Sequence, residues 1–367
     1  MGVRIATVEV IPYALPFSEF YVTARGSLAQ REMVLLRLRS DDGLTGLGEA
    51  VPMSLRGGAT LARVVGELEL LSELSELDEA GLRGGIANLS APARCAALTA
   101  LMDLRGRRAA AEGHPTATRA PFQPLSGGND DRAGAVACNA TLVAGEPAAV
   151  AADAERWAEE GFSTFKLKLG TGDDTGQVRA VREAVGTGAR IRVDANASWE
   201  VAAAVRTLRE LEELDVELAE QPVATLEEAA EVAAATSIPI AADESVASRS
   251  DAERAVSLGA CELTGIKLSK VGGPEEAIEI AEVLPSYVSS ALDGPGGIAA
   301  AAQVAQTLGE NAPAGAVDLA HGLATQRLFS ASVATTECEL RDGMLHLPSG
   351  PGLGVEIDER ALDHHRL

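Results

Sequence analysis

The feature of this sequence that most constrains its fold is a set of five charged residues at nearly regular intervals. Lys168, Asp194, Glu220, Asp243 and Lys267 each stand at the polar end of a short apolar run, and the intervals between them are 26, 26, 23 and 24 residues. Each interval is about the length of one strand and one returning helix. Five successive strand–helix units would place these side chains at the carboxyl ends of neighbouring parallel strands, where they converge on one mouth.

The same alternation extends over most of the chain after Ala133. Short apolar runs alternate with helix-period segments, which predicts eight strands, the first over residues 135–142 and the last over residues 315–320. Even spacing favours a closed barrel, because a doubly wound sheet breaks its rhythm at the switch point. We predict an α/β fold with a modified TIM barrel, (β/α)7β.

The first part of the chain has a different pattern. Residues 3–13 and 32–49 predict three antiparallel strands, with a hairpin turn at Asp41-Asp42-Gly43. Helix-period patterns follow over residues 59–82 and 91–112. Strands followed by helices indicate an N-terminal α+β domain.

Two further segments set the domain boundaries. A stretch rich in Pro, Gly, Thr and Asp between Glu112 and Arg132 predicts a linker, and residues 339–357 predict a hairpin that returns to the first domain. The predicted parts are an α+β capping domain, a catalytic barrel and a C-terminal segment that completes the cap, over residues 1–125, 126–325 and 326–367 respectively.

Composition excludes several classes of protein. The 367 residues are 46% hydrophobic, enough to fill both cores, and the formal charge of −23 opposes binding to nucleic acid or anionic lipid. The start lacks the pattern of a secretory signal, and no apolar run approaches eighteen residues, so we expect a cytoplasmic protein without membrane contact. The four cysteines have no CxxC spacing and are expected to be reduced and buried; they are Cys95, Cys138, Cys261 and Cys338.

The three acids of the regular set suit a hard divalent cation. Asp194, Glu220 and Asp243 offer only oxygen ligands, which Mg²⁺ prefers, although Mn²⁺ fits the same donors. The alternative is that each acid caps the helix that follows it. Capping does not explain three successive acids between two lysines, because like charges brought together cost energy unless a cation compensates.

Two lysines occupy one strand of the series. Lys166 and Lys168 are two residues apart, so both point to the same face, here the barrel interior. A solvated strand edge is the alternative for an isolated pair of this kind. Repulsion and burial would both lower the pKa of Lys168 and make it a base near neutral pH. Lys267 lies across the barrel, so a substrate over the metal would be flanked by two amines.

This arrangement suits removal of a proton next to a carboxylate. A metal-bound carboxylate acidifies its α-proton, a lysine removes it, and an enediolate forms. Loss of a β leaving group would make the protein a lyase. Return of the proton from the opposite lysine would make it a racemase.

These residues, in this order, resemble the muconate-lactonizing-enzyme subgroup of the enolase superfamily. The resemblance rests on the Lys166-X-Lys168 pair, DANASW, EQP, ADES and IKLSKVGG, and it covers nearly the whole chain. It implies that the three acids bind Mg²⁺ and that Lys168 and Lys267 are the acid/base groups, with Lys166 tuning its neighbour. The supporting residues that it implies are Asn196, Glu244 and Lys270.

The end of the predicted barrel resembles the o-succinylbenzoate synthase family, dehydratases of menaquinone synthesis. The resemblance lies in the serine pair of VSSALDGPGGIAAAAQVAQTLG and in the turn of DLAHGLATQRLF. Dipeptide epimerases of the subgroup carry an Asp-X-Asp pair at the eighth strand. This chain has Asp318-Leu319-Ala320, so the second acid, which would bind a substrate amine, is absent.

Several residues are candidates for substrate contacts. The N–H groups of the Gly-Gly-Ile helix start could bind a substrate carboxylate, although a close-packing turn is the alternative. Either of two cap arginines, Arg25 and Arg56, could pair with a succinyl carboxylate, although a surface arginine without a partner is the more common case for each. The candidate set is Arg25, Ser289, Ser290, Gly296, Gly297 and Asp318.

We therefore expect a Mg²⁺-dependent enzyme that acts on a small carboxylate, with syn dehydration to o-succinylbenzoate preferred. The alternatives are an N-acylamino acid racemase, a dipeptide epimerase and a muconate-type cycloisomerase. A non-catalytic barrel is more remote, because such a protein gains nothing from clustering buried charge. Barrels of this kind commonly assemble, so a homo-oligomer stays open.

Overall fold

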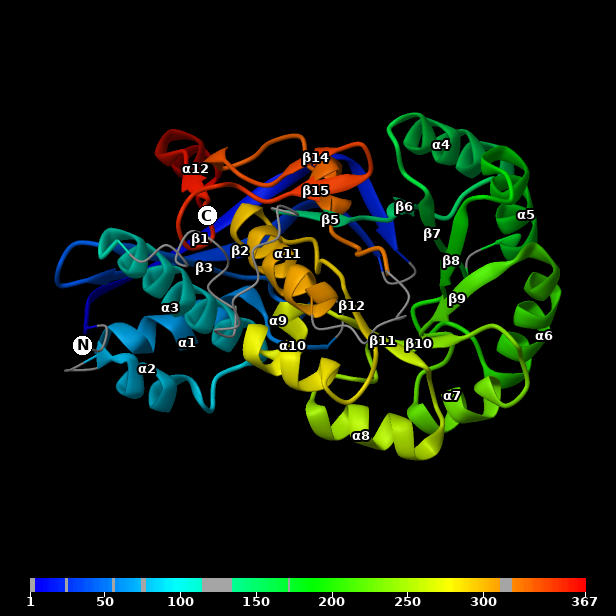
Figure 1. Ribbon diagram of the computed structural model, residues 1–367, viewed down its shortest axis with the longest axis horizontal. Coiled ribbons are helices and arrows are strands. Elements are labelled where there is room, and N and C mark those ends of the chain that lie inside the picture. Colours follow the sequence, from blue (N-terminus) through cyan, green and yellow to red (C-terminus); the bar gives the residue numbers. More distant parts are fainter. Residues whose placement is uncertain are drawn as a thin grey trace.

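The computed structural model has a capping part beside a parallel barrel (Figure 1). It describes residues 4–23, 26–54, 57–73, 77–113, 134–170, 172–310 and 319–367. The cap is built on an antiparallel sheet of order β3-β2-β1-β4, whose strands are β1 (Arg4–Thr23), β2 (Gly26–Ser40), β3 (Thr45–Ala50) and β4 (Leu77–Asp78). The predicted turn is confirmed, and its Gly43 has a φ of 87°, which glycine adopts without steric cost.

The helices of the cap differ in part from the prediction. They are α1 (Leu61–Glu69), the 3₁₀ helix η2 (Leu70–Glu73), α2 (Glu79–Ile86) and α3 (Ala91–Ala111). The last confirms the prediction over residues 91–112. A single helix over residues 59–82 is wrong, because the side chain of Asp78 accepts the N–H of Gly81 and begins a new helix there.

Two glycines let α3 lie directly on the sheet. A Cβ atom added at Gly48 would lie 1.9 Å from the carbonyl oxygen of Ala96, and one at Gly46 would lie 2.1 Å from that of Ala100. Any larger residue at either position would push α3 away from β3, so these glycines fix the depth of the cap core.

The barrel sheet is parallel and has the order β12-β11-β10-β9-β8-β7-β6. Its strands are β6 (Ala140–Leu142), β7 (Thr164–Lys168), β8 (Arg190–Asp194), β9 (Val216–Glu220), β10 (Ile240–Ala242), β11 (Leu263–Ile266) and β12 (Ser286–Val288). Parallel bridges from Cys138 to His321 and from Ser289 to Gly322 join the two edges of this sheet. Residues 321 and 322 therefore occupy the eighth strand position and close the barrel.

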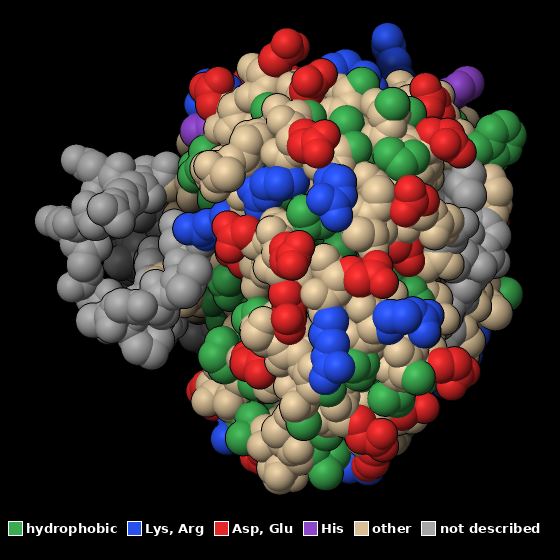
Figure 2. All heavy atoms as spheres, turned by 90° about the vertical axis from the view of Figure 1, so that its right-hand side faces the viewer, with side chains coloured by type: hydrophobic (Ala, Val, Ile, Leu, Met, Phe, Trp, Pro, Cys, Tyr) green, Lys and Arg blue, Asp and Glu red, His purple; other side chains and the backbone are tan. Residues whose placement is uncertain are grey.

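Helices between the strands cover the outside of the barrel (Figure 1). They are α4 (Pro147–Glu159), α5 (Asp174–Val185), α6 (Val201–Leu211) with η4 (Glu212–Leu214), α7 (Leu226–Ala233), α8 (Arg249–Leu258), α9 (Leu268–Val271), α10 (Pro274–Ala281) and α11 (Pro295–Glu310). Acidic and basic side chains are interspersed on the outer surface of this region (Figure 2). The negative charge of the chain is thus distributed on that face together with Arg side chains.

The first predicted barrel strand is interrupted. Residues 135–142 were expected to form one strand, but β5 (Ala135–Ala137) pairs antiparallel with β15 (Met344–His346) and only β6 belongs to the barrel. The chain changes partner at Cys138 and Asn139, where the backbone bonds to Gly343 and His321 instead. Most of the predicted eighth strand, and the predicted linker with its boundary near residue 125, lie outside the described residues.

The C-terminal segment contacts both parts. It forms β13 (Ala334–Thr336), β14 (Glu339–Arg341), β15 (Met344–His346), β16 (Glu356–Ile357) and α12 (Glu359–His365), after the 3₁₀ helix η5 (Ala324–Leu328). The predicted turn at Asp342-Gly343 is confirmed, but the hairpin pairs with β5 and not with the cap sheet. The chain then returns to the cap, where the N–H of Leu353 donates to Asp103 at 2.6 Å and the N–H of Leu367 donates to the carbonyl of Pro12 at 3.0 Å.

Two expectations about composition are also tested. The four cysteines are buried thiols, as predicted, and burial raises the pKa of the Cys261 thiol to about 11. Among the described residues, no helix combines the length and the apolar character that crossing a bilayer requires.

A buried carboxylate from the cap joins the two parts. Glu49 of β3 accepts a hydrogen bond from the Tyr13 hydroxyl at 2.8 Å and from the N–H of Gly294 at 2.6 Å, just before α11 begins. The N–H of Gly296 also donates to it, at 3.3 Å. Burial, and then the nearby Asp293 carboxylate, raise the pKa of Glu49 to about 7. Since the folded protein binds this proton more tightly than the unfolded chain, ionisation of Glu49 opposes folding.

We expect Glu49→Gln to change how stability depends on pH. The contribution of protonated Glu49 is fully present below its ordinary pKa of 4.5 and is lost as the pH rises through about 7. The variant keeps a neutral side chain, so its free energy of unfolding relative to the parent should increase over this window by more than about 1 kcal/mol. Urea denaturation at several pH values measures this difference. Glu32→Gln, on an exposed position of β2, is the control, and a pH-independent difference for Glu49→Gln would contradict the assignment.

Candidate active site

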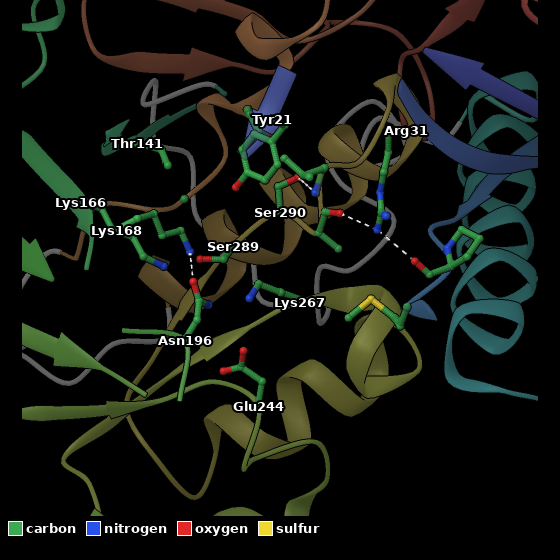
Figure 3. A pocket seen from close by; sticks show the side chains of 16 residues that line it. Tyr21, Arg31, Thr141, Lys166, Lys168, Asn196, Glu244, Lys267, Ser289 and Ser290 are labelled. Atoms are coloured by element: carbon green, nitrogen blue, oxygen red, sulfur yellow. Dashed lines mark hydrogen bonds between the residues drawn. The ribbon is translucent and has the colours of Figure 1, made fainter. Parts of the chain in front are cut away.

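The structure brings the five regularly spaced residues to one end of the barrel, and two of them, Lys168 and Lys267, are labelled in Figure 3. Lys168, Asp194 and Glu220 are the last residues of β7, β8 and β9, and they are aligned as neighbours in the sheet register. Asp243 directly follows β10, and Lys267 directly follows β11. The predicted placement at strand ends is therefore confirmed by the strands themselves.

The loops after two of these strands have unusual backbone conformations. Asn196, Ala197 and Gln221 have φ values of 48°, 59° and 38°, in the left-handed region that side chains other than glycine rarely adopt. Such strain persists only where the surroundings fix it, and it gathers at functional sites. The side-chain oxygen of Gln221, Oε1, accepts a hydrogen bond from the N–H of Asp243 at 2.8 Å, which links the ends of β9 and β10.

The carboxylates are buried and paired with lysines. Lys166 Nζ lies 2.8 Å from Asp194 Oδ2 and 2.5 Å from Glu220 Oε2, and the three side chains are almost completely excluded from solvent. Burial alone would lower the pKa of Lys166, but the charges of Asp194 and Glu220 outweigh it and raise that pKa above its ordinary value. Lys166 is therefore a fixed cation between the two carboxylates.

Lys168 and Lys267 face the same cavity from opposite sides of the barrel. Lys168 Nζ donates to Asp194 Oδ2 at 2.6 Å and to Asn196 Oδ1 at 3.1 Å. Lys267 donates to Asp243 Oδ2. Burial raises the pKa of Asp194, but Lys166 and Lys168 together lower it well below its ordinary range, so this carboxylate is ionised.

The predicted supporting residues lie where they can orient the others. Asn196 holds Lys168, and its own N–H donates to Asp194 Oδ1 at 2.9 Å. Lys270 Nζ donates to Asp243 Oδ1 at 3.0 Å and to the carbonyl of Gly265 at 3.2 Å. Glu244 lines the cavity itself.

The donor set fits a hard divalent cation. Within the described ranges, no three His, Cys, Asp or Glu side chains are already packed as a metal site, and ammonium groups lie beside the acids. Asp194, Glu220 and Asp243 nevertheless offer only oxygen atoms, and Glu220 Oε1 is buried with no hydrogen-bond partner among the described residues. A buried carboxylate oxygen in this condition requires a cation or a donor. The three acids are thus the residues that could hold Mg²⁺.

The cavity above these groups is lined by both parts of the protein (Figure 3). Tyr21, Pro52 and Met53 of the cap line it, together with three residues that were not predicted from the sequence, which are Arg31 of the cap and Thr141 and Thr325 of the barrel side. Arg31 is buried and donates to the carbonyl groups of Pro52 and Ala291, at 3.0 Å each, so it links the cap to the end of β12. Arg31 stands between Gln30 and Glu32 in the sequence, so no local pattern distinguishes it from a surface residue. Arg25, Arg56 and Asp318 lie outside the described residues.

The other predicted substrate contacts differ in outcome. Ser289 and Ser290 both line the cavity, and Ser289 Oγ is buried without a hydrogen-bond partner among the described residues. Ser290 instead donates to Asp293 at 2.7 Å and organises the turn before α11. The N–H of Gly296 donates to Glu49, and Gly297 stands at the same helix start, so this helix end receives a carboxylate of the protein itself and not one from a substrate.

The use of lysine in this chain is restricted to the site. Lys and Arg together number 31, yet only four are lysines: Lys166, Lys168, Lys267 and Lys270. Arginine supplies the remaining cations. Arginine cannot lose its proton near neutral pH, whereas lysine can. This distribution is a sequence signal for amine chemistry at these four positions.

Fold and site together define a capped barrel with acid–base groups at its mouth. Residues 5–112 match the mandelate racemase / muconate lactonizing enzyme N-terminal domain, and residues 149–361 match the enolase C-terminal domain-like family. The chain belongs to the enolase superfamily and, within it, to the muconate-lactonizing-enzyme subgroup.

Relatives of this chain have different activities. A hydrophobic dipeptide epimerase of Enterococcus faecalis is 32% identical over 291 residues, 76% of this chain and 79% of that protein. An o-succinylbenzoate synthase of Thermobifida fusca is 38% identical over 212 residues, but this match covers only 56% of this chain and 63% of that protein. The comparisons therefore show an enzyme of the superfamily and leave its particular reaction open.

Solved structures agree with this assignment. A muconate lactonizing enzyme from Pseudomonas fluorescens in complex with muconolactone has a TM-score of 0.87, with 26% identity and full coverage of both chains. The dipeptide epimerase from Enterococcus faecalis V583, in complex with Mg and the dipeptide L-Leu-L-Tyr, has a TM-score of 0.84, with 27% identity over 97% of this chain and 100% of that one.

We expect Lys166→Met to destabilise the protein strongly. The change keeps the length of the side chain but leaves Asp194 and Glu220 close together without the cation between them. Breaking a buried pair in this way costs about 3–5 kcal/mol. Arg254→Met, which breaks the exposed pair with Glu227, should cost at most about 1 kcal/mol. Urea denaturation without divalent metal compares the two, and equal losses would show that the barrel mouth does not depend on this charge pairing.

Proposed function

We propose that this enzyme removes the proton next to a substrate carboxylate, in a Mg²⁺-dependent reaction. The observation that carries the proposal is that Lys168 and Lys267 face one cavity from opposite sides, above three buried carboxylates. Asp194, Glu220 and Asp243 would hold the ion. Bound there, Mg²⁺ would stabilise the negative charge that develops on the substrate carboxylate. The Mg in the complex of the dipeptide epimerase relative supports this choice of metal.

The charged residues of the site then have separate roles in the reaction. Lys168 removes the α-proton, and its contact with Asn196 keeps the amine directed at the cavity. Lys267, on the opposite face, supplies positive charge near the enediolate or returns a proton to it. Lys166 stays charged between two acids and fixes their positions. The cap covers the cavity with Tyr21 and Met53, which limits the access of water.

Our preferred reaction is the syn dehydration that forms o-succinylbenzoate, a step of menaquinone synthesis. Lys168 takes the α-proton and returns it to the departing hydroxyl group, which leaves as water. The relative from Thermobifida fusca supports this choice. The eighth-strand position supports it too, since Ala320 stands where an acid would be needed for a substrate amine, and its carbonyl is occupied by Arg192.

The second candidate is a racemase of N-acylated amino acids or a dipeptide epimerase. Both reactions need two amines on opposite faces of one carbon atom, which Lys168 and Lys267 supply, and the Enterococcus faecalis relative spans 76% of this chain. A muconate-type cycloisomerase uses the same lysines differently and is supported by the structural likeness to the lactonizing enzyme. A barrel without catalysis is disfavoured because all four lysines of the chain gather here.

We expect α-proton exchange in D₂O with Mg²⁺ present. The probes are N-succinyl amino acids, and ¹H NMR follows loss of the α-proton signal. Lys168→Ala should slow exchange by at least about 100-fold, because it removes the general base. Arg254→Ala, an exposed change far from the cavity, should leave the rate unchanged. Exchange at the parental rate in Lys168→Ala would exclude Lys168 as the base.

The two leading reactions can be distinguished by the substrates they accept and by the effect of Lys267→Arg. We expect a higher kcat/KM for dehydration, followed by the absorbance of the hydroxycyclohexadiene substrate, than for racemisation of N-succinyl amino acids, followed by optical rotation. Arginine keeps the charge of Lys267 but cannot exchange a proton. Lys267→Arg should therefore retain part of any dehydration and abolish racemisation. Faster racemisation by the parent would favour the second candidate, and neither reaction together with no proton exchange would defeat the enzymatic proposal.

A further inference from the structure

The two oxygen atoms of the Glu220 carboxylate differ in their hydrogen bonds. Its Oε2 atom accepts hydrogen bonds from two donors, Lys166 Nζ at 2.5 Å and the hydroxyl group of Tyr287. Its Oε1 atom is buried and has no hydrogen-bond partner among the described residues. One oxygen is therefore fixed by the protein, while the other is left for a further positive charge or donor.

Tyr287 lies on β12, across the barrel from β9, and it is fully buried. Its ring occupies space left by Gly265 on the adjacent β11. A Cβ atom at Gly265 would lie 3.0 Å from the tyrosine hydroxyl and 3.1 Å from the ring carbon that carries it. The absence of a side chain at Gly265 thus lets the hydroxyl reach Glu220.

A buried arginine also lies over the ring. The guanidinium carbon of Arg192 lies 5.1 Å from the centre of the Tyr287 ring, within the range of a cation–π contact. Arg192 is held in turn by Glu217, at 2.5 Å, and by the carbonyl of Ala320, at 2.6 Å. The ring is therefore in contact with both Gly265 and Arg192, and its hydroxyl donates to Glu220 Oε2.

We propose that Tyr287 is a positioning residue for Glu220: its hydroxyl group fixes Oε2 so that Oε1 is directed at a divalent cation. This inference rests on the proposed Mg²⁺ site. Lys166 donates to the same oxygen but brings a positive charge that opposes a second cation. Tyr287 orients the carboxylate without adding charge, so the attraction of Glu220 for a metal ion is preserved. Partners of metal-binding carboxylates act in this way in other metal sites.

The test is the Mg²⁺ affinity of Tyr287→Phe, measured by isothermal titration calorimetry without substrate. Phenylalanine keeps the ring in contact with Gly265 and Arg192 and removes only the hydroxyl group. We expect the Kd for Mg²⁺ to rise by about 10- to 100-fold. Gly265→Ala, which keeps the tyrosine but displaces its hydroxyl from Glu220, is a second variant with the same expected weakening.

The matched control is Tyr13→Phe. Tyr13 is also a buried tyrosine that donates to a carboxylate, Glu49 at 2.8 Å, but in the cap. It should lose stability without any change in the Kd for Mg²⁺. If the parent binds Mg²⁺ and Tyr287→Phe binds it equally well, the role of Tyr287 is overturned while the proposed function stands. If the parent does not bind Mg²⁺, both the role of Tyr287 and the proposed metal site are overturned.

Discussion

The pairing of buried opposite charges at the mouth of the barrel is the constraint on which the rest of this structure depends. A carboxylate removed from water loses several kcal/mol of solvation, and attraction to a cation compensates only if the geometry is close. Asp194 and Glu220 meet this condition through Lys166, because β7, β8 and β9 are aligned in register. The regular strand–helix spacing in the sequence provides that alignment. The same sequence pattern therefore specifies both the barrel and the site.

The sequence predicted the structure well where a residue type repeats at a spacing that few folds can explain. The strand ends that carry Lys168, Asp194 and Glu220 could be predicted, because the interval of one strand and one helix repeats. The break between β5 and β6 could not, since pairing with β15, some 200 residues away, gives no local signal. Tyr287 was invisible for a related reason. In a sequence it resembles any core aromatic residue, and only the three-dimensional neighbourhood shows Gly265 beside it.

The N–H groups at the start of α11 were predicted to bind a substrate carboxylate. They bind a carboxylate, as a helix start favours, but the carboxylate is that of Glu49 in the cap. The cap is therefore anchored at the barrel end that carries the cavity. Stacked aromatic rings also hold the cap in place. The ring centre of Phe17 lies 4.9 Å from that of Phe329 in the C-terminal segment and 5.4 Å from that of Tyr21, which lines the cavity. The wall of the cavity is thus set partly by the last forty residues of the chain.

The confinement of lysine to this site has a practical consequence. Apart from the terminal amine, every primary amine of the chain belongs to the charge cluster at the barrel mouth. Reductive methylation with ¹³C-formaldehyde would therefore be confined to this site and the terminal amine, and Lys168, whose side chain is 21% exposed, is the site amine most accessible to the reagent. Each methylated amine would report its own protonation and its own contact with a carboxylate. The base proposed for the reaction could thus be observed with a reagent that leaves the arginines of the chain unmodified.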